Sequence, residues 1–207
     1  MNIRKEYKTV LNNIFLILII LIFLFLKFNY FGLIHFNFDE AWFFSWNPFT
    51  AKGSYNFEGH AINYTGFHKG PFYQLLLALP YPLTNNFELQ FIIKIIFDAI
   101  SIFFLYKIGC FIDKKVGIIA SSLYAFSSYF FIQTSRVVDP NYNLFFSTIF
   151  FYSILKISQN KPKYFFTSIL SMVFGIQLHP NAFPLILMTI ICIRPVKYTP
   201  VAAARTR

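Results

Sequence analysis

The sequence predicts an all-α protein, a polytopic membrane helical bundle. Of its 207 residues, 57% are hydrophobic and 22% are aromatic, whereas only 13% are charged. A water-soluble globule of this composition would have too little polar surface to cover its core. The apolar residues are gathered into runs, several of them close to the roughly 20 residues that a helix needs to cross a bilayer. Membrane lipid is therefore the first expected partner of the chain.

Six apolar runs are predicted to cross the bilayer as helices. The first follows Arg4, Lys5 and Lys8, a charge layout typical of a signal sequence, but the run is too long and lacks a small-residue cleavage site. We therefore expect an uncleaved signal anchor. The predicted spans comprise residues 14–34, 89–112, 116–134, 142–157, 164–178 and 182–193.

The apolar segment 71–83 is predicted not to cross. It contains Pro80 and Pro82, and as a helix it would be only about 20 Å long. Cytoplasmic loops collect Lys and Arg, and counting 71–83 as a span would place every later basic loop on the opposite side. We therefore expect an interfacial or re-entrant helix here, with both termini cytoplasmic.

The formal charge of +10 does not indicate nucleic acid. Lys and Arg stand in short clusters between apolar runs, where anionic lipid head groups and membrane orientation explain them. Residues 1–195 are predicted to form one transmembrane module. Residues 196–207 form a basic, Ala/Arg-rich tail, which we interpret either as a truncated or frameshifted end or as a basic cytoplasmic tail.

The same topology places ionisable side chains from three separate loops on the outer face. Their convergence predicts a functional site there rather than a scatter of loop residues. The residues concerned are Asp39, Glu40, Glu58, Glu88, Asp139 and His179.

Asp39 and Glu40 are the first candidates for catalysis. They stand beside an aromatic stretch that is expected to lie in the head-group layer. A carboxylate at such a boundary suits proton abstraction from a hydroxyl. The alternative is that Asp39 caps the following helix, for which Asp is a favoured residue.

Lys69 is the candidate for binding phosphate. It follows His68 and precedes Gly70-Pro71, where a helix is expected to begin, and a helix N-terminus attracts anions. The alternative is a lysine whose side chain only anchors the chain at the membrane interface.

Residues 135–140 supply Arg136 and Asp139, three positions apart between two predicted spans. They could form a surface ion pair of little energetic weight, or Asp139 could be a second carboxylate opposite Asp39. His179 ends a span on the same side. With His68 it could bind a divalent cation, although a lone His is more often part of a hydrogen-bonded structure.

Lys94 and Asp98 lie four residues apart inside the second predicted span, on one helical face. Because unpaired charges are costly in hydrocarbon, we expect a structural ion pair there.

Three stretches together resemble a known family. They are Asp39-Glu40 followed by aromatic residues, the run KGPFY at 69–73 leading into a leucine-rich helix, and residues 136–139 before another span. Over residues 10–195 the chain resembles the N-terminal half of the GT-C class of membrane glycosyltransferases, in the group of protein O-mannosyltransferases, aminoarabinose transferases and lipopolysaccharide-core glycosyltransferases. The resemblance implies a GT-C-like fold.

The resemblance also implies a function. Such an enzyme moves a sugar from a polyprenyl-phosphate donor to a lipid, glycan or protein hydroxyl, in the cell inner (plasma) membrane with its site facing outward. By position, Asp39 resembles the catalytic carboxylate, with Glu40 beside it. Asp139 resembles the second outer-loop aspartate, and Lys69 the lysine at the donor phosphate, where Arg136 is the second expected cation.

The chain also departs from the family pattern. Gly70 stands where the first of two prolines is usual, and His68 stands where an acidic residue is often found. Family members are longer, so this chain could be an inactive fragment. The alternative function is a multi-pass transporter or flippase component without catalytic activity, whose charges would concentrate near the bilayer midplane.

Overall fold

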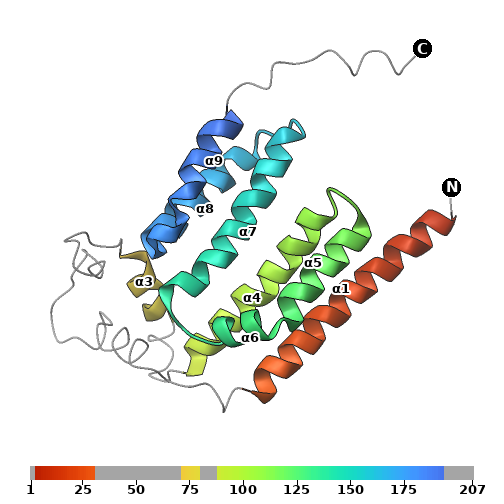
Figure 1. The fold of residues 1–207 in the computed structure, drawn as a ribbon, viewed down its shortest axis with the longest axis horizontal. Helices are drawn as coiled ribbons and strands as arrows, with labels where there is room; N and C mark the ends of the chain where they lie inside the picture. Colours follow the sequence, from red (N-terminus) through yellow and green to blue (C-terminus); the bar gives the residue numbers. More distant parts are fainter. Residues whose placement is uncertain (1–2, 31–70, 80–87, 194–207) are drawn as a thin grey trace.

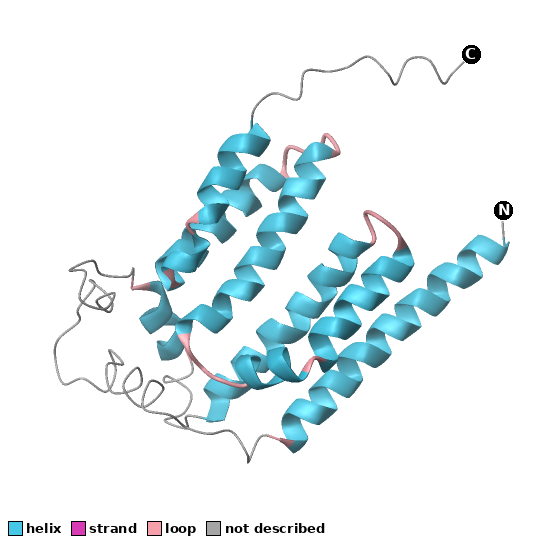
Figure 2. Ribbon diagram, in the orientation of Figure 1, coloured by secondary structure: helices cyan, strands magenta, loops and turns pink. Residues whose placement is uncertain are grey.

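The protein is all-α in every part that its computed structural model describes, namely residues 3–30, 71–79 and 88–193. Helices connected by short turns make up these ranges, and no strand occurs in them (Figure 2). The predicted fold class is therefore confirmed for the described residues.

The first group of helices consists of α1 (Ile3–Asn29), α4 (Glu88–Gly109) and α5 (Lys114–Phe126), which lie side by side (Figure 1). One hydrophobic cluster joins them. Its buried members are Leu16, Ile19, Phe23, Ile95, Ile102, Tyr106, Tyr124 and Ala125.

The second group consists of α7 (Asp139–Ser158), α8 (Tyr164–Leu178) and α9 (Pro184–Ile193), with a 3₁₀ turn at Pro180–Ala182 between the last two. Phe150, Ala182 and Leu185 form the core between these helices. The two groups meet where α7 packs on α4, with the rings of Phe97 and Phe145 stacked 4.4 Å apart.

The short helix α3 (Phe72–Ala78) sits at one end of the bundle, beside α8 and the start of α7 (Figure 1). Seven residues cover only about 10 Å of helix, a third of the hydrocarbon core. Residues 80–83 of the predicted segment lie outside the described residues, so its re-entrant or interfacial placement remains a prediction. Its buried face joins a core cluster with residues of α4, α7 and α8, comprising Tyr73, Leu76, Leu77, Phe91, Val137, Val138, Tyr142, Phe146 and Leu178.

The predicted span 116–134 is wrong as one helix. The structure has α5, which ends at Phe126, and a separate short helix α6 (Ser128–Thr134). Between them Ser127 takes an extended conformation with ψ 122°. Serine hydroxyls compete for backbone hydrogen bonds and favour helix ends, and a hydropathy window does not register such a break. Thirteen residues of α5 are also short for a span.

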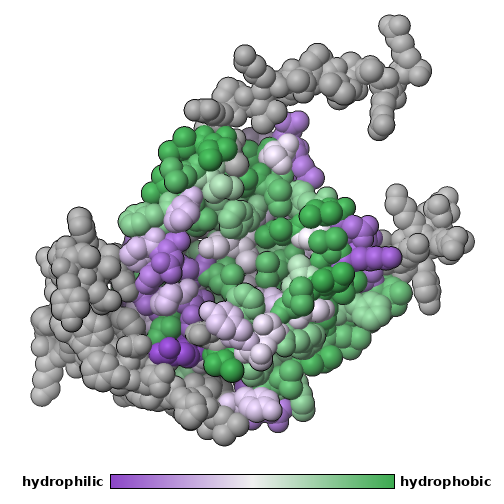
Figure 3. All heavy atoms as spheres, in the orientation of Figure 1, coloured by the Kyte–Doolittle hydropathy of each residue, from purple (hydrophilic) through white to green (hydrophobic). Residues whose placement is uncertain are grey.

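The number of spans remains a prediction. Within the described residues, one helix is long and apolar enough to cross a membrane, the stretch Val10–Asn29 of α1, and Tyr164–Leu178 and Pro180–Ile191 are shorter apolar helices. Much of the α1 surface is apolar and exposed, including Ile17, Leu21 and Phe25. Figure 3 shows apolar residues spread over the visible face of the bundle, as expected for contact with lipid.

The two ends of the bundle differ in chemistry (Figure 1). The N-terminus, the α4–α5 turn and the α7–α8 turn lie at one end, which carries Lys107, Lys114, Lys115, Lys156, Lys161 and Lys163. We call it the basic end. The C-terminal end of α1, helices α3 and α6, and the turn between α8 and α9 lie at the other end, which we call the α3 end. This arrangement matches the grouping of loops that the charge pattern predicted.

Candidate functional site

The described site residues all lie at the α3 end. Arg136 precedes α7, Asp139 begins it, and His179 ends α8. These three residues therefore lie at one end of the bundle, and their location at the outer face of the membrane remains a prediction. The other predicted site residues, Asp39, Glu40, His68 and Lys69, lie outside the described residues.

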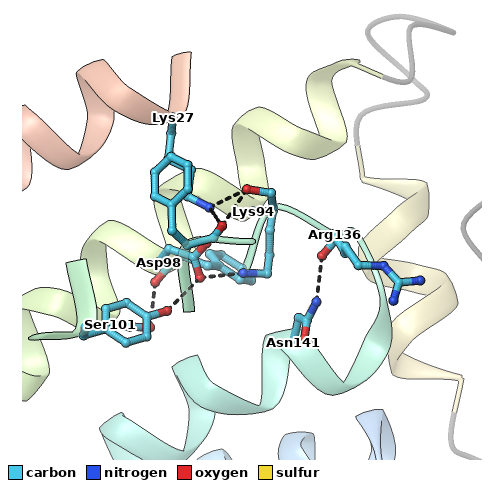
Figure 4. A network of polar contacts seen from close by, with 10 residues as sticks. Lys27, Lys94, Asp98, Ser101, Arg136 and Asn141 are labelled. Atoms are coloured by element: carbon cyan, nitrogen blue, oxygen red, sulfur yellow. Dashed lines mark hydrogen bonds and ion pairs between the residues drawn. The ribbon is translucent and has the colours of Figure 1, made fainter. Parts of the chain in front are cut away.

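The connection between α6 and α7, residues 135–138, is held from three sides. From α3, the Tyr73 hydroxyl donates to the Val137 carbonyl at 2.9 Å. From α7, Asn141 Nδ2 donates to the Arg136 carbonyl at 3.1 Å. From α1, Lys27 Nζ donates to Ser135 Oγ at 2.7 Å. Arg136 therefore projects from backbone that is fixed on both sides of it, and in Figure 4 its side chain points away from the Lys94–Asp98 pair.

Asp139 occupies the first turn of α7, directly before Pro140. Proline suits the first turn of a helix, because its missing N–H would have no partner there. The Asp139 side chain is buried, and a carboxylate in this position is stabilised by the partial positive charge of the helix N-terminus. The structure thus places a buried anion three residues from the Arg136 cation.

His179 caps two elements. Its backbone amide closes α8 by donating to the Gly175 carbonyl, and its Nδ1 accepts from the Asn181 amide at 3.2 Å. Its carbonyl accepts from Asn143 Nδ2 at 3.3 Å. The hydrogen-bonded, structural role that we considered for His179 is thus present.

A metal site at His179 finds little support in the described part of the chain. Its Nδ1 already accepts a hydrogen bond, so a metal would have to bind through Nε2. In the described ranges, no group of three His, Cys, Asp or Glu side chains could hold a metal ion. Since His68 lies outside them, the proposed metal pair remains a prediction.

The Lys94–Asp98 pair lies in the interior of the bundle, as expected for a structural pair. Lys94 Nζ lies 2.5 Å from Asp98 Oδ1, and both residues are 1% exposed. The Tyr124 hydroxyl of α5 donates to the same carboxylate oxygen at 3.2 Å. Lys94 Nζ also lies 5.6 Å from the centre of the Tyr142 ring of α7. The pair therefore joins three helices (Figure 4).

Lys27 supports the backbone of the candidate site, a structural role that the sequence analysis missed. Its side chain is buried, donates to the Phe131 carbonyl at 2.6 Å and lies 4.3 Å from the centre of the Phe131 ring. Lys27 thereby fastens α1 to α6 and to the residues that lead to Arg136. A single lysine near the end of a long apolar run was the available signal, because such a charge requires partners.

The α3 end can therefore present Arg136 and Asp139 from backbone that α1, α3 and α7 hold in place. A guanidinium binds phosphate oxygens through two parallel hydrogen bonds, and a fixed backbone reduces the entropy lost when it does so. The arrangement suits recognition of a phosphorylated ligand next to a carboxylate.

Comparison with known proteins gave one match. The sequence model of the family described as dolichyl-phosphate-mannose-protein mannosyltransferase matches residues 68–198. No curated protein and no solved structure matches the chain. The matched region includes α3, the 135–138 connection and the helices of the second group.

Proposed function

The chain belongs to the dolichyl-phosphate-mannose-protein mannosyltransferase family, a family of GT-C-type membrane glycosyltransferases, and on this premise we propose its reaction. It transfers a sugar from a polyprenyl-phosphate donor to a hydroxyl of a lipid, glycan or protein at the outer face of the cell inner (plasma) membrane. The family match supports this proposal, because the family is described by sugar transfer from dolichyl-phosphate-mannose. The matched residues include Lys69, Arg136 and Asp139, whereas Asp39 and Glu40 precede them.

In the proposed reaction, Arg136 and Lys69 bind the donor phosphate. Two cations would neutralise the charge that grows on the phosphate as the bond to the sugar breaks. Arg136 contributes a planar fork of donors, whereas Lys69 contributes a compact charge. The fixed 135–138 connection supports this role, because a cation held in place before the reaction needs no reorganisation during it.

Asp39 is proposed as the general base, with Glu40 beside it. The acceptor hydroxyl gives its proton to Asp39, and its oxygen forms a bond to the anomeric carbon. The bond between that carbon and the phosphate oxygen breaks, and the phosphate leaves with the electron pair. Asp139, buried at the start of α7, would then stabilise positive charge on the sugar ring.

A divalent cation at His68 and His179 is a separate and weaker proposal. The capping role of His179 and the lack of further ligands in the described ranges give it little support. No step of the proposed reaction depends on a metal.

A matched pair of aspartate variants tests the proposed base. Asp39→Asn replaces the carboxylate of the proposed base by an amide, whereas Asp113→Asn makes the same replacement at the basic end. Asp113 caps α5 by accepting from the Lys115 amide at 2.7 Å, and Asn caps equally well. Membranes containing each variant are supplied with radiolabelled dolichyl-phosphate-mannose, and release of dolichyl phosphate is measured.

We expect Asp39→Asn to lower release by about 100-fold or more, the contribution of a positioned general base. Asp113→Asn should retain the rate of the unmodified chain. Near-normal release by Asp39→Asn would show that the base is assigned wrongly.

A further inference from the structure

We propose that Tyr73 is a positioning residue for the donor-phosphate site. Its hydroxyl holds the Val137 carbonyl and so fixes the backbone from which Arg136 and Asp139 project. The inference rests on the proposed function, since it assigns Arg136 to the phosphate. It concerns Tyr73 on α3, which acts on the ligand only through the 135–138 connection.

The hydrogen bond is well placed for this role. Tyr73 is 2% exposed and Val137 is 0% exposed, so neither the hydroxyl nor the carbonyl has ready access to water. The bond joins residues 64 positions apart in the chain at 2.9 Å. A buried carbonyl that loses its donor remains unsatisfied, and the backbone around it shifts or opens to find another partner.

The 135–138 connection is the segment where such a shift would matter. It has no helical ladder of its own, since α6 ends at Thr134 and α7 begins at Asp139. The Arg136 carbonyl belongs to the first peptide unit after Arg136, and the Val137 carbonyl belongs to the second. A displacement of the Val137 carbonyl therefore moves the backbone between Arg136 and Asp139. Asn141 holds the first of these peptides through the Arg136 carbonyl, and Tyr73 holds the second through the Val137 carbonyl.

Tyr73 also connects this backbone to the helix that follows Lys69. α3 begins at Phe72, three residues after Lys69 in the sequence, and Lys69 itself lies outside the described residues. Phe72 fastens α3 to α8 by stacking on Phe174 with ring centres 4.3 Å apart. Through Tyr73 and Phe72, α3 thus joins the 135–138 connection to α8.

Tyr142 provides a matched control. It belongs to the same core cluster, is 0% exposed, and its ring centre lies 6.0 Å from that of Tyr73. Its hydroxyl has no hydrogen-bond partner in the described structure. Tyr73→Phe and Tyr142→Phe therefore remove the same atom from neighbouring buried rings, but only the first breaks a bond to the 135–138 connection.

The test compares both variants with the unmodified full chain in lipid nanodiscs. KM and kcat are measured with dolichyl-phosphate-mannose, and hydrogen exchange is measured on peptides that cover residues 132–141. We expect Tyr73→Phe to raise KM roughly three- to tenfold, the range that corresponds to one hydrogen bond, with kcat within about twofold. Exchange in 132–141 should be faster. Tyr142→Phe should match the unmodified chain in both measurements.

Measuring KM and kcat together distinguishes a displaced Arg136 side chain from a smaller amount of folded protein. A smaller folded fraction lowers kcat and leaves KM unchanged, whereas a displaced Arg136 raises KM. Unchanged KM and unchanged exchange in Tyr73→Phe would overturn the proposal, as would a rise in KM that Tyr142→Phe shares. If the unmodified chain shows no turnover, the proposed function fails, and exchange in 132–141 alone decides whether Tyr73 holds the connection.

Discussion

Breaking the Lys94–Asp98 pair should destabilise the bundle far more than removing the whole pair. The two charges lie 2.5 Å apart, and each residue is 1% exposed. Removing one member of a buried pair costs about 3–5 kcal/mol, whereas replacing both by apolar residues is often neutral. Both residues stand on α4, so part of the pair survives when the helices separate, and we expect about 2–3 kcal/mol for each single variant.

The two single variants should lower the free energy of unfolding by different amounts. Lys94→Met leaves Asp98 with the Tyr124 hydroxyl, which donates to its carboxylate at 3.2 Å. Asp98→Leu leaves the Lys94 ammonium buried without its carboxylate and beside the Tyr142 ring, whose centre lies 5.6 Å from Nζ. Asp98→Leu should therefore be the more destabilising substitution.

A double-mutant cycle measures this coupling directly. The unmodified chain, both single variants and the Lys94→Met/Asp98→Leu double variant are unfolded with SDS in mixed micelles, and the folded fraction is followed by pulse proteolysis. The double variant should lie within about 1 kcal/mol of the unmodified chain. If the single effects are each below about 0.5 kcal/mol and simply add, the charges do not form a coupled pair in the bundle interior, and the reasoning is refuted.

Two further predictions concern the packing of the bundle. Gly109→Ala should destabilise by about 1–3 kcal/mol or more, because the added Cβ would lie 2.5 Å from the Gly117 Cα, whereas Gly175→Ala meets only a side-chain carbon at 3.2 Å and should cost less in the same SDS titration. Equal effects would contradict the backbone contact between α4 and α5. Lys27→Met should lower stability by about 1–3 kcal/mol, since it removes donors from the Phe131 carbonyl and Ser135 Oγ. The exposed Lys161→Met should be neutral in thermal unfolding, and a neutral Lys27→Met would remove the basis for its buried role.

The bounds of a helix were predictable where its apolar run is flanked by charged residues and by proline, which interrupts helices. The run 164–178 coincides with α8, because Lys161-Pro162-Lys163 precedes it and His179-Pro180 follows. The start of α7 was placed too late, at Tyr142, because residues 139–141 are polar. They form its first turn nonetheless, since Asp and Pro favour that position.

For the candidate site, the sequence predicted only which loops lie at the same end of the bundle. The pattern of basic loops grouped Arg136, Asp139 and His179, and the structure has all three at one end of the bundle, whereas the number of spans remains a prediction. The roles of Tyr73 and Lys27 were not predictable, because each depends on a hydrogen bond to residues more than 60 positions away. Neither hydropathy nor charge pattern encodes which backbone carbonyl a buried side chain reaches.

Recognition of the donor phosphate by Arg136 is the central claim, and equilibrium binding tests it most directly. Nanodiscs containing the chain are titrated with dolichyl phosphate and, separately, with uncharged dolichol. The unmodified chain and Lys161→Gln should both prefer the phosphate, whereas Arg136→Gln should lose about tenfold or more of that preference, as a charged hydrogen bond implies. An unaltered preference in Arg136→Gln would contradict a phosphate site at the α3 end.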